Sequence, residues 1–177
     1  MSLEKNFEIV KFEDLKVIRY RGAISDSVKV DLFLTLDMYD KYEGTYAQIV
    51  PRFRPKYPNA EEFANESLEY ILDLAWQDGL PENVKNLMSN GKVAVFDAHG
   101  THYDDIGWGV HIQDEGRIPI TRLLDEHFSE YDTVLLTVCN PNRQQLEPQK
   151  GSVIYPLGFF GIEPNDFEMV VRKDPNI

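Results

Sequence analysis

The sequence predicts an α/β fold, with a mostly parallel sheet flanked by helices and a small β-hairpin insertion, in one domain over residues 1–177. Two runs, residues 92–98 and 133–138, are almost continuously apolar, which is typical of strands buried on both faces of a parallel sheet. Helical periodicity lies between the predicted strands. This alternation of strand and helix favours a parallel sheet covered by helices.

The first predicted strand covers residues 28–36, where β-branched and aromatic side chains alternate with polar ones. Residues 39–58 hold several prolines, which exclude a regular helix. We interpret this stretch as a packed surface loop, with a substrate-binding loop as the alternative. A helix is predicted next, because Asn59 is a suitable N-cap and apolar residues then recur at helical spacing until about Asp78.

The second half of the chain continues the alternation. The apolar strand at residues 92–98 is followed by a predicted hairpin over residues 108–119, with its turn at residues 114–116. Residues 120–128 predict a short amphipathic helix, and residues 133–138 the second buried strand. We expect the two buried strands to be joined by a crossover and to run in the same direction.

Charge limits the classes of partner. Lys and Arg total 18 against 30 Asp and Glu, which gives a net charge of −12. Phosphate backbones and anionic lipids attract the opposite sign, so we expect neither nucleic acid nor membrane as a partner. We interpret the acidity mainly as a contribution to solubility, with a preference for a cationic substrate as the alternative.

The single cysteine, Cys139, cannot form an internal disulfide, which favours a reducing compartment, and we expect the cytoplasm. The N-terminal residues do not show the basic and then apolar pattern of a signal peptide. The sequence also contains no apolar run of about 18 residues, so a membrane-spanning helix is not expected. The oligomeric state stays open.

Reactive side chains follow both predicted buried strands. His99 and Gly100 come after the first, and Cys139 comes after the second. The carboxyl ends of parallel strands meet at one edge of a sheet, and neighbouring strands lie about 4.8 Å apart. The imidazole is therefore expected within reach of the thiol proton. Gly100 lacks a Cβ, so its backbone N–H can approach a substrate carbonyl.

These residues resemble the core of a known family. A buried strand ending in His99-Gly100, a hairpin and helix, and a buried strand ending in Cys139 are similar to the caspase–haemoglobinase group of cysteine peptidases (clan CD), which includes caspases, legumains, gingipains, separases and bacterial CHAT domains. The likeness covers residues 92–140. It implies a caspase-like three-layer sandwich, with His99 as the catalytic imidazole and Cys139 as the nucleophile. The backbone N–H groups of Gly100 and Cys139 would form the oxyanion hole.

The leading hypothesis is therefore a cysteine peptidase-like hydrolase that acts on a peptide or protein substrate and needs no cofactor or metal. Asp104 and Asp105 lie close in sequence to His99, so they are candidates to bind a Lys or Arg side chain of the substrate. Trp108 is a candidate to line the substrate pocket.

Two other interpretations stay open. The chain is either a catalytically inactive, caspase-like partner-binding domain, in which Cys139 is only a small buried hydrophobe, or a metal-dependent hydrolase. The second alternative rests on Asp97, His99 and His102, which are oxygen and nitrogen ligands close together in sequence.

Overall fold

A computed structural model of the chain describes residues 7–13, 15–25, 28–35, 38, 60–77, 79–81, 84, 88–89, 91–112, 116–147, 151–160 and 166–171. The predicted loop at residues 39–58 lies outside these residues.

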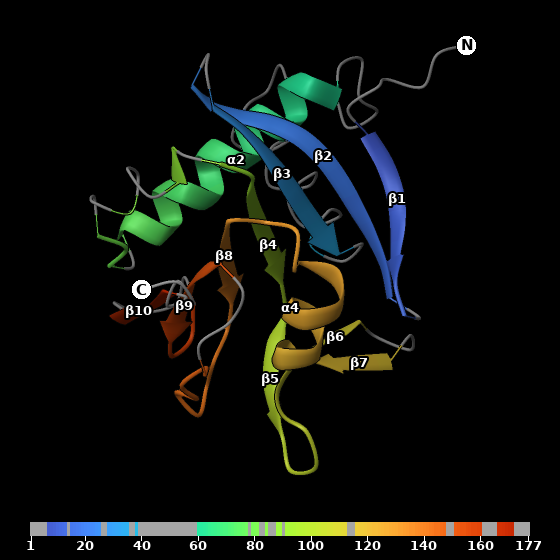
Figure 1. Ribbon diagram of the computed structural model, residues 1–177, viewed down its shortest axis with the longest axis vertical. Helices are drawn as coiled ribbons and strands as arrows, with labels where there is room; N and C mark the ends of the chain where they lie inside the picture. The colour runs from blue at the N-terminus through green and yellow to red at the C-terminus, as the bar shows by residue number, and fades with distance from the viewer. Residues whose placement is uncertain are drawn as a thin grey trace, which may run out of the picture.

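The described residues form ten strands and two helices (Figure 1). The strands are β1 (Phe7–Phe12), β2 (Leu15–Ser25), β3 (Val28–Thr35), β4 (Val93–Ala98), β5 (Gly100–Tyr103), β6 (Gly107–Ile112), β7 (Gly116–Pro119), β8 (Thr133–Val138), β9 (Ser152–Leu157) and β10 (Asp166–Val171). The helices are α2 (Ala60–Gln77) and α4 (Ile120–His127).

Seven strands make up the main sheet, in the order β1-β2-β3-β4-β8-β9-β10. The central strands β3, β4, β8 and β9 are parallel to one another, whereas β1, β2 and β10 pair with their neighbours in the antiparallel direction. A second sheet consists of three antiparallel strands in the order β5-β6-β7. The main sheet is therefore mixed, with a parallel centre.

The predicted sandwich, a mostly parallel sheet flanked by helices, is wrong, because the described chain is mostly β and contains one mixed and one antiparallel sheet. The sequence analysis overlooked the hairpin of β1 and β2. Its hydrophobic pattern is weak for two reasons. Glu8 and Ile9 on the edge strand β1 are both exposed, and the adjacent Val17 and Ile18 on β2 are both buried, on opposite faces of the sheet, so polar and apolar residues do not alternate there.

Several individual predictions are confirmed. The strands predicted at residues 28–36, 92–98 and 133–138 are β3, β4 and β8, and the helices predicted after Asn59 and at residues 120–128 are α2 and α4. The predicted hairpin is the pair β6 and β7. It belongs to a sheet of three strands, because β5 also pairs with β6.

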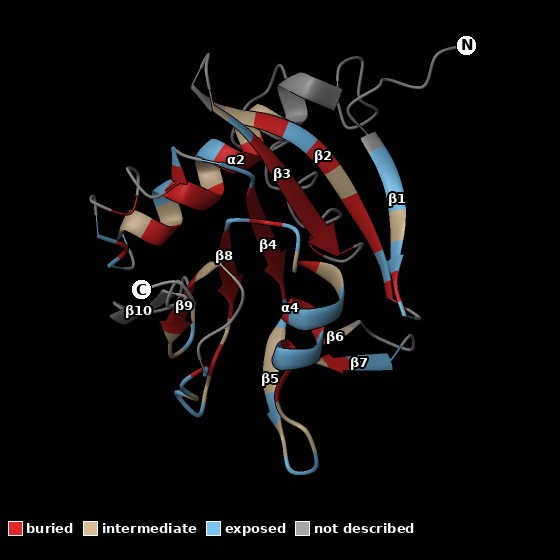
Figure 2. Ribbon diagram, viewed as in Figure 1, coloured by how far each residue is buried: buried red, intermediate tan, exposed pale blue. Residues whose placement is uncertain are grey.

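Two hydrophobic cores cover opposite faces of the main sheet, one beneath each helix (Figures 1 and 2). The α4-side core includes Phe33, Phe96, Ala98, Leu123, Leu136 and Val138. The α2-side core includes Leu32, Leu68, Ile71, Val95 and Leu135. Successive residues of a strand point to opposite faces, so β4 and β8 contribute to both cores and every residue in them is buried. This burial fixes the positions at which the two strands end.

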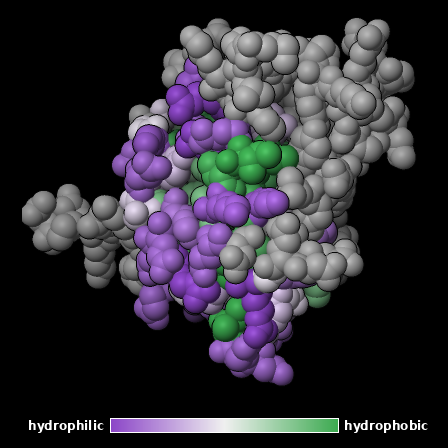
Figure 3. Space-filling model, turned by 90° about the vertical axis from the view of Figure 1, so that its right-hand side faces the viewer, coloured by the Kyte–Doolittle hydropathy of each residue, from purple (hydrophilic) through white to green (hydrophobic). Residues whose placement is uncertain are grey.

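The edge of the main sheet at β1 is polar around a small apolar area. Figure 3 shows hydrophilic side chains beside a hydrophobic patch on this side of the molecule. Ile9 is 59% exposed, and the exposed charges of Glu8 and Lys11 flank it. Charges on an edge strand oppose pairing with another chain. Among the described helices, none has the length and apolar character needed to cross a membrane.

A buried polar network links β3 to the segment before β8. The hydroxyl of Tyr131 donates a hydrogen bond of 2.6 Å to Oδ2 of Asp31, and Nε of Arg21 donates one of 3.2 Å to Oδ1. Burial, assisted by the hydrogen bond to Asp31, raises the pKa of Tyr131 well above its usual value of 10.0. The folded protein therefore favours the neutral phenol.

Replacing Tyr131 with Phe removes this donor from a buried carboxylate, and we expect a loss of about 1–2 kcal/mol in the free energy of unfolding near neutral pH. In the wild-type protein the phenol ionises more readily when unfolded, so the stability that it contributes is complete below about pH 10 and decreases as the pH rises further. Urea unfolding of both proteins at about pH 8 and about pH 10.5 measures the two effects. An equally steep alkaline loss of stability in the variant would contradict the assignment.

Candidate active site

His99 and Cys139 come together at the carboxyl ends of β4 and β8. The two strands are parallel neighbours, and their last register pair is Ala98 with Val138. The next residue on each chain is His99 and Cys139, so these two are neighbours across the strands, about 4.8 Å apart at the backbone. The structure thus brings together two residues that lie far apart in the sequence.

The alternation of side chains along the strands predicts that both side chains leave the sheet on the same side. Ala98 and Val138 belong to the α4-side core, so alternation along the strands directs His99 and Cys139 to the α2 side. A Cβ built on Gly100 would collide with the Val138 side chain, which places Gly100 back on the α4 side and agrees with this alternation. His99 is exposed and Cys139 is partly exposed, and the Cys139 Sγ lies 3.9 Å from the carbonyl oxygen of Phe160.

Gly100 is required by packing at this point. A Cβ there would also collide with the carbonyl oxygen of Cys139 and would lie 3.2 Å from the Cys139 nitrogen. Because the neighbouring atoms belong to the backbone, they cannot rotate away. Gly100 therefore allows the start of β5 to lie directly against Cys139.

Trp108 fixes the backbone of Cys139 from the α4 side. Its side chain is 1% exposed, and its indole Nε1–H donates a hydrogen bond of 2.7 Å to the carbonyl oxygen of Cys139. Its ring also packs against the ring of Tyr155. The residue that the sequence analysis assigned to a substrate pocket thus lies in the core, and its described contacts position the segment after β8.

Asn140 holds the same segment in place through its side chain. This role was not predicted from the sequence. The Asn140 side chain is completely buried and donates hydrogen bonds to the carbonyl oxygens of Gln144 and Pro156, at 2.9 and 3.0 Å. Its Oδ1 accepts a bond of 3.0 Å from the backbone N–H of Gln144, and its own backbone N–H donates to the carbonyl of Gly158 at 2.8 Å. These bonds tie the turn after Cys139 to β9.

The acidic residues proposed for substrate binding lie away from this pair. Asp104 and Asp105 are exposed in the turn between β5 and β6, which extends beyond the main sheet (Figure 1). Along an extended chain the turn begins about 16 Å from His99. Asp105 also forms an ion pair with Arg117 on β7, which partly neutralises its charge.

The three residues of the metal alternative do not form a common site in the described structure. Asp97 is completely buried in the main sheet, whereas His102 is exposed on the second sheet. Within the described residues, the possible metal ligands that do converge are elsewhere, at Glu13, Glu126 and His127. There Arg122 donates to both carboxylate oxygens of Glu13, at 2.9 Å each, and so competes with any cation.

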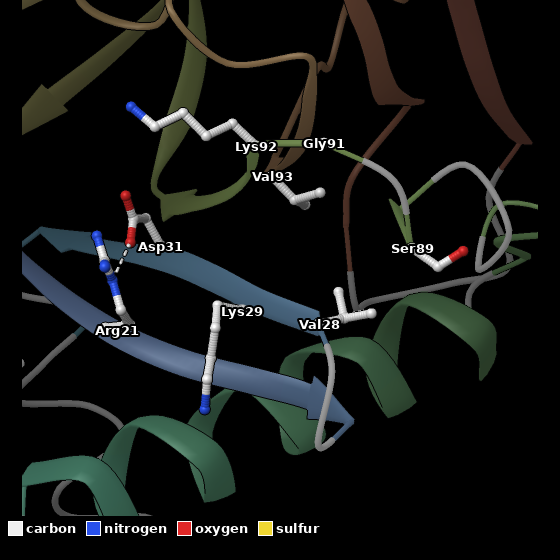
Figure 4. Close-up of a pocket in the computed structure, with 8 residues that line it drawn as sticks. All are labelled: Arg21, Val28, Lys29, Asp31, Ser89, Gly91, Lys92 and Val93. Carbon is white, nitrogen blue, oxygen red and sulfur yellow. Dashed lines mark hydrogen bonds and ion pairs between the residues drawn. The ribbon is translucent and has the colours of Figure 1, made fainter.

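A separate pocket of about 330 Å³ lies at the opposite end of the central strands, beside the first residues of β3 and β4 (Figure 4). Arg21 and Asp31 form an ion pair at its side, while the side chains of Lys29 and Lys92 extend away from its centre. The length of β4, about 20 Å, separates this pocket from His99. It is therefore not part of the His99 and Cys139 site.

Comparison with protein-family models, with curated proteins and with solved structures finds no match to this chain.

Replacing Gly100 with Ala forces the new methyl group against the Cys139 backbone, and we expect the free energy of unfolding to decrease by about 1–3 kcal/mol. Thr101→Ala, one position along the same strand, serves as the control and should stay within about 0.5 kcal/mol. Urea unfolding measures both. Equal stability of the two variants would show that the contact with Cys139 is not tight.

Replacing Asn140 with Ala leaves buried carbonyl and N–H groups without their side-chain partner. We expect a decrease of about 2–3 kcal/mol in the free energy of unfolding. Asn142, exposed in the same turn, provides the matched control, and Asn142→Ala should have little effect. Thermal or urea unfolding distinguishes the two, and a similar small loss in both would contradict the role given to Asn140.

Proposed function

We propose that the protein is a cysteine peptidase-like hydrolase in which Cys139 is the nucleophile and His99 is the general base. The observation that carries this proposal is the position of the two residues, which directly follow the neighbouring parallel strands β4 and β8 after the register pair of Ala98 and Val138. A base within reach of a thiol is the arrangement that activates a cysteine nucleophile.

The reaction follows from these two groups. His99 takes the thiol proton of Cys139, and the thiolate attacks the carbonyl carbon of the substrate, so that a C–S bond forms and the π electrons move to oxygen. When the tetrahedral intermediate collapses, the C–N or C–O bond breaks and the leaving group takes the proton from His99. Water, deprotonated by His99, then hydrolyses the thioester and restores the thiol.

The backbone around Cys139 supports the proposal. Oxyanion stabilisation requires N–H groups that are held in place before the reaction. Trp108 holds the carbonyl of Cys139, and Gly100 packs directly against the same peptide. We assign the N–H groups of Gly100 and Cys139 as donors to the oxyanion.

The resemblance to clan CD peptidases adds a second line of support. The His-Gly and Cys that carry it follow two adjacent parallel strands in this protein, with the second sheet and α4 between them in the chain. We therefore propose a peptide or protein as the substrate, and the cytoplasm, where a thiol stays reduced, as the compartment. A preference for basic substrates would rest on the net charge of −12 rather than on Asp104 and Asp105.

Alkylation with iodoacetamide tests the proposal, because Cys139 is the single cysteine of the chain and reports alone. Near pH 7 we expect native Cys139 to react faster than the urea-unfolded chain, and His99→Ala to slow the native reaction about tenfold, because the nearby imidazole favours the thiolate. Mass spectrometry of the alkylated protein over time gives the rates.

The exposed His102 provides the control, since His102→Ala should leave the rate unchanged. The proposal is wrong if native Cys139 reacts no faster than the unfolded chain and His99→Ala has no effect. That result would favour the alternative of an inactive, partner-binding domain.

A further inference from the structure

A carboxylate is buried directly beneath the proposed catalytic pair. Asp97 on β4 and Thr137 on β8 form a register pair and are 0% and 1% exposed. The hydroxyl of Thr137 donates a hydrogen bond of 2.5 Å to Oδ1 of Asp97. Removing an ionised carboxylate from water is costly even when it is hydrogen-bonded, so an acid in a central strand points to a role other than packing.

The position of Asp97 connects it to His99. The flanking residues Phe96 and Ala98 point into the α4-side core, so Asp97 points to the α2 side, as His99 does. Asp97 lies in β4 and His99 directly follows that strand, so with the chain still extended the two are separated by about 6.6 Å at the backbone. A carboxylate and an imidazole can bridge this separation with a hydrogen bond.

A carboxylate partner assists a His base. The nitrogen that accepts the thiol proton must carry no hydrogen, so the other nitrogen must be the N–H donor. A carboxylate that accepts from this N–H fixes the tautomer and stabilises the imidazolium that forms during the reaction. Titratable residues close to His99 along the described chain or across the strands are Asp97 on β4, Cys139 after β8 and His102 on β5.

We infer that Asp97 is a positioning residue for His99. Its Oδ2 accepts a hydrogen bond from Nδ1–H of His99, which directs Nε2 toward the thiol of Cys139, while the Thr137 hydroxyl holds Oδ1. This inference rests on the proposed function for the role of the tautomer, but the contact itself can be measured without any activity.

The ¹⁵N shifts of the imidazole nitrogens test the contact, with the His99 signals among the four histidines assigned by comparison with His99→Gln. Asp97→Asn keeps the shape of the side chain and removes its charge. We expect this variant to shift His99 from the Nδ1–H tautomer toward the Nε2–H tautomer and to slow alkylation of Cys139 about tenfold. Asp97→Glu keeps the charge and should restore part of both effects, whereas Thr137→Val keeps the carboxylate and should change the tautomer of His99 less than Asp97→Asn does.

The two proposals fail separately. If folded Asp97→Asn keeps the His99 tautomer of the wild type, the inference is wrong, even where His99→Ala still slows alkylation. If Asp97→Asn changes this tautomer but His99→Ala leaves the alkylation rate unchanged, the contact stands and the proposed catalysis fails. Should Asp97→Asn not fold, the ¹⁵N shifts of wild-type His99 decide: one Nδ1–H tautomer supports the inference, and predominance of the Nε2–H tautomer overturns it.

Discussion

The hydrogen bond from the Trp108 indole to the Cys139 carbonyl joins the two sheets of this protein. Trp108 belongs to β6, whereas Cys139 follows β8, so the bond ties the small antiparallel sheet to the end of a central strand. Gly100 and Gln144 also take part in this contact between the two sheets. Gly100 has room for no Cβ beside Cys139, and the Gln144 Oε1 accepts a bond of 3.0 Å from the backbone N–H of Trp108. The Cys139 backbone is thus held by the Trp108 indole and by the close approach of Gly100, and the Gln144 side chain holds Trp108 in turn.

At this end of the sheet, the two faces carry different kinds of side chain. On the α4 side, the end of β8 is surrounded by Trp108 and the apolar residues of the α4-side core. On the α2 side, the same strand ends carry the side chains able to move a proton, those of Asp97, His99 and Cys139. Because side chains alternate along a strand, one rigid strand can carry both kinds. In the proposed function, Cys139 is held at the end of such a strand and would need little rearrangement to react.

Local sequence signals predicted the central elements well and the architecture poorly. The apolar strands β4 and β8 and the helix α2 have strong periodic patterns that do not depend on the rest of the chain. The hairpin of β1 and β2 has no such pattern, so the mixed sheet was not predicted. The buried position of Trp108 and the pairing of Asp97 with Thr137 depend on the register between segments far apart in the sequence. A single sequence does not specify how two distant strands align. The one available signal was that Asp97 and Thr137 are polar residues at the same position in two apolar strands.

The pair of Asp97 and Thr137 interrupts the apolar character of β4 and β8 at matching positions. Their neighbours on the strands, Phe96 and Leu136 among them, are fully buried in the α4-side core. A pair of apolar side chains of similar volume at these two positions would avoid the cost of desolvating a carboxylate, because buried polar pairs are often no more stable than apolar ones. The hydroxyl of Thr137 offsets part of that cost through its hydrogen bond. Packing gives no reason for the acid. Its position two residues before His99 therefore supports the positioning role inferred for it, because proteins give up stability at functional sites.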